Sequence, residues 1–481
     1  MSKSIKRNLL YNIALNISKV LFPLITAPYV SRVLEPDGVG LFNFSSTYAN
    51  YFALFAVLGI PLYGVREIAK LRGSKSDENI FLSEIISLEL IVTIIVAALY
   101  FLTLLLIPQL KENWTIFIIA GIALYITPCK VEWFFSGKEE FGYITLRSII
   151  VKVVNIIALF IFVHGKNDLV LYVILGALAT VANELWNYGK LLKDGYRPYF
   201  TLSFRRHLKS LFILFASTVA ISIYTMLDTL MLGFMSDYNQ VGFYNNANHI
   251  ARSLMPVVTS LAAVAMPRLS YYMQDGNWDE INDLINKSLS IVSFLAFPIT
   301  VGVVILAPTF IPLFLGELFY GSILPLQVIV WVVTIIGLNN ITTIQVLAGM
   351  GYDMPYLKTV LTGTVCNFSL NLLLIPYCGA VGASISSVLA EVAVLTISTR
   401  FVYKKTPIRF RSIRELLLSG VVVLGFLPIS YYTSIIADGW LFVSLFTVIA
   451  GLYYIIAQLV LGNNSANIFY NLVRNKICRH E

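Results

Sequence analysis

The chain has 481 residues, of which 58% are hydrophobic and only 12% are charged, and its mean hydropathy is +0.79. Soluble domains contain about 45–50% apolar and about 25% charged residues, so this composition excludes an ordinary soluble protein. The net charge of +8 does not indicate a nucleic-acid partner, because Lys and Arg gather in short loops between apolar segments, as in membrane proteins.

Apolar segments of about 18 or more residues, which are long enough to cross a bilayer, recur along the whole chain. Segments such as 85–107 and 291–306 are apolar on every face, which favours helices over the alternating strands of a membrane barrel. The sequence therefore predicts an all-α polytopic membrane protein with about 14 transmembrane helices. The expected spans are 8–33, 40–64, 81–107, 114–136, 143–164, 168–191, 208–235, 242–266, 285–314, 322–349, 355–377, 380–403, 414–434 and 439–461.

The basic residues alternate between the two sides of this arrangement. One side receives 27 Lys and Arg, whereas the other receives only Arg32, Lys111 and Lys166. The positive-inside rule then places both termini in the cytoplasm and requires an even number of spans. No cleavable signal peptide is expected, because the first apolar run resembles the later spans.

An ordered set of matches predicts an internal repeat. The motif VGLFN at 39–43 recurs as VGFYN at 241–245, and Asn155 and Glu184 match Asn367 and Glu391 further along. We expect two related six-helix bundles plus two C-terminal helices. The predicted domains are an N-terminal lobe at 1–206, a C-terminal lobe at 207–405, and two additional helices with a cytoplasmic tail at 406–481. Two six-helix bundles enter the membrane in the same orientation, an arrangement typical of carriers.

Cations inside predicted spans need an explanation, because a charge at the bilayer centre costs about 2.5–3.5 kcal/mol on insertion scales. We interpret them, with nearby polar residues, as the lining of an aqueous cavity between the two bundles that receives an anion such as a diphosphate. The alternative is that each cation pairs with a neighbouring acid, for instance Lys130 with Glu132, or extends to the interface. The candidates are Lys19, Lys130, Arg147, Lys152, Asn155, His249 and Arg252.

Three carboxylates inside predicted spans, Asp228, Glu184 and Glu391, are candidates for coupling transport to Na⁺ or H⁺. Glu184 and Glu391 occupy repeat-equivalent positions near cytoplasmic helix ends, so a structural role in each half is the alternative. No other cofactor is expected.

No motif for catalysis or for a resident metal occurs in the sequence. It contains no GxSxG, no HExxH and no Walker lysine, so we expect a carrier rather than an enzyme. The cysteines lack metal-ligand spacing. They are Cys129, Cys366, Cys378 and Cys478.

Three groups of motifs resemble the polysaccharide flippase (Wzx-type, O-antigen transporter) family. PYVSRVL at 28–34, followed by GVG at 38–40, is similar to the first-helix signature of that family. GVREIAK at 64–70 is similar to its loop after the second helix. EWFFSG at 132–137, leading into YITLR at 143–147, is similar to its signature around the fourth and fifth helices. The chain departs from the family at Glu35-Pro36, where a glycine is usual, and this affects an outer loop only.

The resemblance implies the fold of the multidrug/oligosaccharidyl-lipid/polysaccharide (MOP) exporter superfamily. It implies that the substrate is an undecaprenyl-diphosphate-linked oligosaccharide, moved by alternating access from the inner to the outer leaflet of the bacterial cytoplasmic membrane. The product would serve the synthesis of capsule, O-antigen or another surface polysaccharide. The implied partners are membrane lipids, a polysaccharide polymerase and glycosyltransferases, and the basic loop 190–209 is a candidate contact for anionic lipid or a glycosyltransferase.

Two other functions stay open. A cation-coupled multidrug exporter of the same superfamily would have a cavity dominated by acids, whereas cations prevail among the charged residues within these spans. A membrane polysaccharide polymerase would have large outside loops with catalytic Arg or His, whereas the outside loops here are short.

Overall fold

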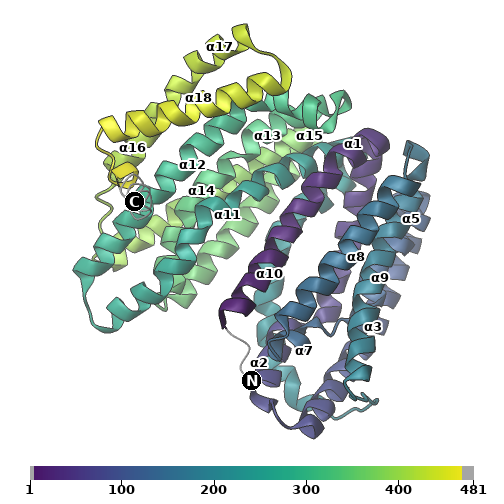
Figure 1. The fold of residues 1–481 in the computed structure, drawn as a ribbon. Coiled ribbons are helices and arrows are strands. Elements are labelled where there is room, and N and C mark those ends of the chain that lie inside the picture. Colours follow the sequence, from purple (N-terminus) through teal and green to yellow (C-terminus); the bar gives the residue numbers. More distant parts are fainter. Residues whose placement is uncertain (1–4, 468–481) are drawn as a thin grey trace, which may run out of the picture. The chain divides into compact units, whose positions relative to one another are not determined.

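The computed structural model describes residues 5–467, and every regular element within them is helical (Figure 1). This confirms the predicted all-α class. Nine helical segments in this part of the chain are long and apolar enough to cross a membrane, and two shorter apolar helices occupy Trp114–Cys129 and Thr225–Met235. Two of the nine, Leu10–Leu71 and Asp353–Lys405, each contain two predicted spans. The total of about 14 spans stays a prediction.

The chain forms two compact units, residues 1–242 and 243–481. The first unit extends beyond 206 because α10 packs against α1, and the predicted lobe boundaries stay a prediction. The helices of the first unit are α1 (Ile5–Val57), α2 (Ile60–Leu71), α3 (Lys75–Leu106), α4 (Pro108–Glu112), α5 (Trp114–Ala120), α6 (Ile122–Tyr125), η1 (Thr127–Cys129), α7 (Glu132–Gly137), α8 (Phe141–Phe162), η2 (Lys166–Asp168), α9 (Leu169–Lys193), α10 (Arg205–Met235) and the start of α11 (Tyr238–Gln274).

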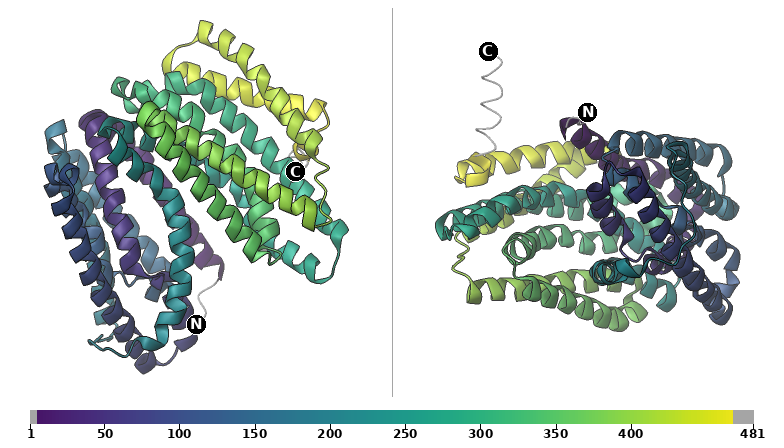
Figure 2. Two further views of the ribbon diagram at one scale, coloured as in Figure 1. Left: turned by 180° about the vertical axis from the view of Figure 1, so that it is seen from behind. Right: turned by 90° about the horizontal axis from the view of Figure 1, so that it is seen from below.

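The second unit contains the rest of α11 and all later elements. Its last two helices, α17 and α18, pack against each other and against α12 (yellow and teal in Figures 1 and 2). These elements are α12 (Trp278–Leu315), η3 (Glu317–Ser322), α13 (Ile323–Ile329), α14 (Trp331–Asn340), η4 (Ile341–Ala348), α15 (Asp353–Lys405), α16 (Ile413–Val422), η5 (Val423–Gly425), α17 (Phe426–Ile436) and α18 (Gly439–Val460).

Left-handed backbone positions divide the longest helical elements. Glu35 (φ 58°) lies between the predicted spans 8–33 and 40–64, so the two spans follow each other within α1 without a loop. The second of them ends at Val57 rather than at residue 64, because Leu58 and Gly59 both have positive φ. A new helix, α2, then starts at Ile60.

The predicted span 114–136 is correct in position but wrong in continuity. It consists of α5, α6, the short 3₁₀ helix η1 and α7. Pro128 lies in η1, and Lys130 follows it with a non-helical backbone (φ −76°, ψ 70°). Proline removes a backbone donor and hinders a regular helix. The break therefore separates the aromatic helix α7, which packs on α2, from the apolar helices before it.

The extended segment that follows α9 lies along α3. Side chains of α3 that are one helical turn apart form hydrogen bonds with the backbone of this segment. The Asn79 carboxamide accepts from the Arg197 backbone N–H at 2.8 Å and donates to the Arg197 carbonyl at 3.1 Å. The hydroxyl oxygens of Ser83 and Ser87 accept the backbone N–H groups of Tyr199 and Thr201 at 3.1 and 3.0 Å. The side chains of one helix face thus satisfy backbone groups that have no partner in a helix or sheet.

The second unit contains the same arrangement between α12 and the segment after α15. Asn282 accepts from the Arg409 N–H at 2.8 Å, and Asn286 donates to the Arg409 carbonyl at 2.9 Å. Asn286 also accepts from the Arg411 N–H at 2.6 Å. The contact of Asn79 with Arg197 in the first unit therefore corresponds to the contact of Asn282 with Arg409 in the second unit, as expected for an internal repeat.

Candidate functional site

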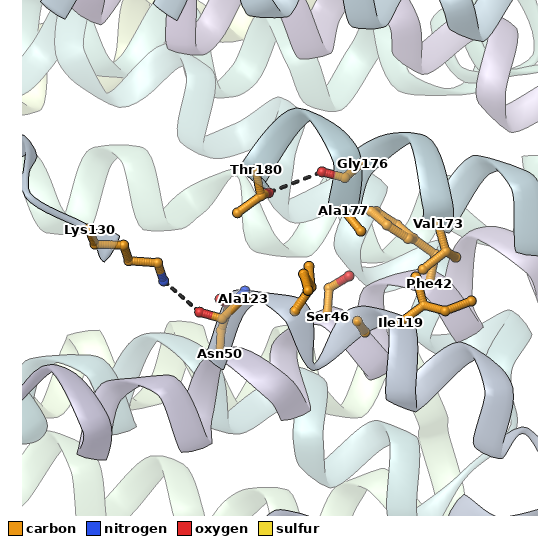
Figure 3. A pocket seen from close by; sticks show the side chains of 12 residues that line it. Phe42, Ser46, Asn50, Ile119, Ala123, Lys130, Val173, Gly176, Ala177 and Thr180 are labelled. Carbon is orange, nitrogen blue, oxygen red and sulfur yellow. Dashed lines mark hydrogen bonds between the residues drawn. The ribbon is translucent and has the colours of Figure 1, made fainter. Parts of the chain in front are cut away.

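A pocket of about 330 Å³ lies inside the first unit, among α1, α5, α6 and α9 (Figure 3). Most of its wall is apolar, and Lys130 is the one charged residue among those that line it. The lining residues are Phe42, Ser46, Asn50, Ile119, Ala120, Ile122, Ala123, Lys130, Val173, Gly176, Ala177 and Thr180.

The break after η1 determines where the Lys130 side chain points. Its ammonium group donates a hydrogen bond of 2.6 Å to the carbonyl of Ala123, as Figure 3 shows. The charged groups that act on it electrostatically are the carboxylates of Glu89 and Glu184. The alternative that Lys130 pairs with Glu132 does not hold, because Glu132 pairs with Arg147. Only Val131 separates Lys130 from Glu132, and side chains two positions apart do not face each other on a helix.

Glu89 on α3 is a site residue to which the sequence analysis gave no role. The residue is 2% exposed, and its Oε2 has no hydrogen-bond partner within the described part of the chain. Glu184 on α9 is half-buried and accepts from the Asn187 amide at 3.3 Å. Lys130 is thus the cation shared by two intramembrane acids from different helices. The signal in the sequence was the same for both acids, namely a carboxylate inside an apolar span.

Arg147 on α8 is the most deeply buried of the predicted cations, with a side chain 2% exposed. Its Nη2 pairs with Oε2 of Glu132, whose side chain is 45% exposed. The guanidinium also lies 5.8 Å from the ring centroid of Tyr143. Its Nε and Nη1 are buried without a hydrogen-bond partner in the described residues. Each of these donors shares an edge of the guanidinium with Nη2, so an anion can accept two parallel bonds on either edge if Nη2 also donates to it.

A second group of predicted site residues lies between α1 and α8. Lys152 donates to the Ser18 hydroxyl at 3.0 Å and lies 5.5 Å from the Phe22 ring centroid. Lys19 is exposed and Asn155 is half-buried. Lys152 is therefore held by α1, whereas Lys19 projects from it.

The remaining predicted site residues lie elsewhere. Asp228 on α10 is buried in the first unit. On α11, His249 is exposed and Arg252 donates from Nε to Asn248 at 2.9 Å. The buried carboxylate of Glu391 on α15 accepts from Asn339 Nδ2 at 2.5 Å. A single cavity lined by both halves stays a prediction.

No group of three or more His, Cys, Asp or Glu residues in the described part of the chain is arranged to hold a metal ion.

Comparison with known proteins agrees with this architecture. The model of a family described as polysaccharide biosynthesis protein matches residues 5–273. The chain is 29% identical to the "Putative O-antigen transporter" of Escherichia coli (strain K12), over 83% of this chain and 97% of the relative. It is 22% identical to the "Probable low-salt glycan biosynthesis flippase Agl15" of Haloferax volcanii, over 93% of this chain and 94% of the relative.

Among solved structures, "Lipid II flippase MurJ, inward closed conformation" has a similar fold. Its TM-score is 0.77 at 16% identity, and the match covers 94% of this chain and 98% of the other. At this identity the likeness concerns the fold. It confirms a MurJ-like helical fold over nearly the whole chain.

Proposed function

The chain belongs to the polysaccharide biosynthesis protein family, and from this premise we propose that it flips a lipid-linked glycan across a membrane. The observation that carries the proposal is the likeness to the Escherichia coli O-antigen transporter, which extends over 97% of that relative. The proposed substrate is an undecaprenyl-diphosphate-linked oligosaccharide. It moves by alternating access from the inner to the outer leaflet of a bacterial cytoplasmic membrane, with both termini of the chain in the cytoplasm.

The chemical problem is the passage of a diphosphate and several sugars through hydrocarbon. Neither group can leave water unless the protein offers replacement hydrogen bonds and countercharge. Arg147 supports this role, because two of its donors are buried and have no partner in the described residues. A guanidinium can bind phosphate oxygens with two parallel charge-assisted hydrogen bonds. We assign Arg147 to the diphosphate.

Lys130 contributes to the same proposed site in a different way. Its ammonium group is bound to the Ala123 carbonyl and lies in the field of Glu89 and Glu184. In the proposed site, the electrostatic influence of these two acids limits how strongly the ammonium group attracts an anion. Binding that is firm but not too tight is what a carrier needs to release its substrate on the other side.

The same acids support the second candidate function, a cation-coupled exporter. Glu89 has a buried oxygen without a partner in the described residues, and such a carboxylate can bind H⁺ or Na⁺. In the flippase proposal this group, together with Glu184, is the coupling site for an ion gradient. Asp228 and Glu391 are the other candidates for this role.

The test is complementation of a bacterium that lacks its own polysaccharide flippase. The readouts are surface glycan and lipid-linked precursor, measured for the intact chain and for Arg147→Gln at matched expression. We expect the intact chain to restore surface glycan. Arg147→Gln should lower it about tenfold and accumulate precursor, because a charge-assisted hydrogen bond is lost. Lys358→Gln, which removes an exposed cation on α15, is the control and should behave as the intact chain.

Two outcomes would redirect the proposal. If the intact chain restores no glycan but changes resistance to cationic drugs, the exporter function replaces the flippase. If Arg252→Ala also accumulates precursor, the second half contributes to substrate binding. If it behaves as the intact chain, the predicted contribution of Arg252 falls while the flippase proposal stands.

A further inference from the structure

A second pocket, of about 570 Å³, lies in the second unit between α12, α14, η4, α15 and α16. It is separate from the cationic site of the first unit, and the proposed function does not use it. Its volume lies within the range of about 300–1,000 Å³ that is typical of ligand sites. The residues that line it are Leu289, Leu338, Ile341, Thr342, Leu395, Thr396, Thr399, Arg400, Tyr403, Phe410, Ile413 and Leu416.

The inner wall of this groove offers hydrocarbon to an occupant. Leu289 and Ile341 are buried, and they come from α12 and η4. Two hydroxyl groups in the wall are already hydrogen-bonded: Thr342 bonds with Ser398 Oγ at 2.7 Å, and Thr396 donates to the Val392 carbonyl at 2.8 Å. A ligand that enters this part of the groove therefore gains burial and few hydrogen bonds, which suits an acyl chain.

One end of the groove carries a cation without a countercharge. Arg400 is exposed and forms no ion pair with an acidic residue in the described part of the chain. Tyr403, one turn further along α15, is 41% exposed and also lines the groove. Side chains three positions apart on a helix are neighbours. A guanidinium and a phenol hydroxyl therefore lie together at the end of an apolar channel.

The loop that closes this end is held in place. Asn286 bonds to the backbone of Arg409, Arg411 and Ser412, and Phe410 packs edge-on against Tyr403 with ring centroids 5.4 Å apart. The Arg409 guanidinium is bound to two carbonyls, at 3.2 and 2.8 Å. The rim is thus ordered before any ligand arrives, which lowers the entropic cost of binding.

We propose that this groove binds an anionic membrane phospholipid, with one acyl chain in the groove and the phosphate at Arg400. The sequence places this end of α15 on the cytoplasmic side, where anionic lipids and basic segments meet. Five further basic residues lie within 404–414. The groove also opens outward, because Ile413 on its rim is 47% exposed. The bound lipid joins α16 to α15 and is a structural component, not the transported substrate.

Native mass spectrometry of the purified full chain in detergent tests this proposal. It compares phosphatidylglycerol with phosphatidylcholine of the same acyl chains. We expect one phosphatidylglycerol per chain, bound about tenfold more tightly than phosphatidylcholine, because a charge-assisted hydrogen bond favours the anionic lipid. Arg400→Gln should abolish this preference. Lys405→Gln removes an exposed cation outside the lining and should leave the preference unchanged.

A groove-filling variant, Thr399→Phe, should weaken the binding of both lipids. A phosphatidylglycerol with a diazirine in its acyl chain should label residues 395–416 of the intact chain, which tests the site without any substitution. Equal affinity for the two lipids, or a preference that survives Arg400→Gln, would overturn the proposal. Displacement of phosphatidylglycerol by undecaprenyl phosphate at a lower concentration would assign the groove to the substrate lipid and would also overturn it.

Discussion

Gly40 and Gly242 lie backbone against backbone where α1 meets the start of α11. A Cβ atom on Gly40 would lie 1.7 Å from the carbonyl oxygen of Tyr238, and one on Gly242 would lie 2.4 Å from the carbonyl oxygen of Pro36. Gly40 thus faces Tyr238, which lies four positions before Gly242, and Gly242 faces Pro36, which lies four positions before Gly40. These contacts lie within the first unit, and only small residues allow two backbones to approach so closely.

The first prediction concerns this crossing. Gly40→Ala places a methyl group inside the van der Waals radius of a backbone atom, so α1 and α11 must separate. We expect the variant to lose about 1–3 kcal/mol of stability, as overpacked sites do. The measurement is the thermal melting temperature of the purified chain in detergent.

Gly302→Ala is the matched control, because a Cβ atom there meets nothing within 4 Å. In a helix interior, replacing glycine by alanine is favourable by about 1 kcal/mol. The melting temperature should therefore stay or rise in the control and fall in Gly40→Ala. Equal shifts in both variants would mean that α1 and α11 can move apart at no cost.

The second prediction separates two roles of Arg147. If Arg147 only neutralises Glu132, then Glu132→Gln should impair transport as strongly as Arg147→Gln. If Arg147 binds the diphosphate, Glu132→Gln should be milder than Arg147→Gln, because it keeps the guanidinium and changes a side chain that is 45% exposed. We expect the mild result. The measurement is surface glycan in the complementation assay.

Arg147→Lys sharpens this test. Lysine keeps the charge but cannot form the two parallel bonds of a guanidinium. We expect about tenfold less surface glycan, corresponding to about 1.4 kcal/mol. Wild-type transport by Arg147→Lys would show that charge alone is sufficient and would remove the argument for bidentate binding.

The third prediction concerns Lys130 and Glu89. Lys130→Met removes the positive charge that acts on the buried carboxyl group of Glu89, so we expect the variant to be less stable than the intact chain. Adding Glu89→Gln to Lys130→Met removes the uncompensated acid, so the double variant should be more stable than Lys130→Met alone. The measurement is the thermal melting temperature of the intact chain, Lys130→Met, Glu89→Gln and the double variant. Together these four values give the interaction between Lys130 and Glu89. Additive effects of the two substitutions would mean that the two groups do not interact.

The sequence predicted much of the fold because each span must satisfy its own backbone in lipid, which makes hydropathy a direct signal. It did not predict the break around Lys130, because the apolar residues on both sides outweigh Pro128, Lys130 and Glu132 in the hydropathy of the segment. The alternative pairing of Glu132 with Lys130 rested on nearness in sequence, whereas the structure pairs Glu132 with Arg147. The pair of Glu132 and Arg147 joins two helices whose packing is not encoded locally.

The groove around Arg400 lay beyond sequence analysis for a related reason. Its lining comes from five segments between Leu289 and Leu416, each of which is ordinary as an apolar helix. Only the packing of α16 on α12 and the docking of Arg409 on Asn282 bring them together. A binding site built from segments far apart in the sequence depends on tertiary contacts, and these contacts leave no periodic pattern in the sequence.

The last prediction concerns pH and the contact of Lys138 with Tyr196 and Glu78, outside the apolar core of the spans. Burial lowers the pKa of Lys138, but its hydrogen bonds with Tyr196 and Glu78 outweigh burial, so the pKa lies above its ordinary value of 10.5. Burial, with the hydrogen bond to Glu78, raises the pKa of the Tyr196 phenol above 10.0. Both groups are therefore protonated more readily in the folded chain than in the unfolded chain.

A group with a raised folded pKa stabilises the fold fully below its unfolded pKa and loses this contribution as the pH rises through its folded pKa. We therefore expect the melting temperature of the intact chain to be flat up to about pH 9.5 and to fall above about pH 10. Tyr196→Phe should melt at a lower temperature at neutral pH and show a smaller alkaline fall. Tyr199→Phe, at an exposed tyrosine nearby, should follow the intact chain at every pH. If the melting temperature of Tyr196→Phe fell above pH 10 as much as that of the intact chain, the pH dependence would come from groups other than Tyr196.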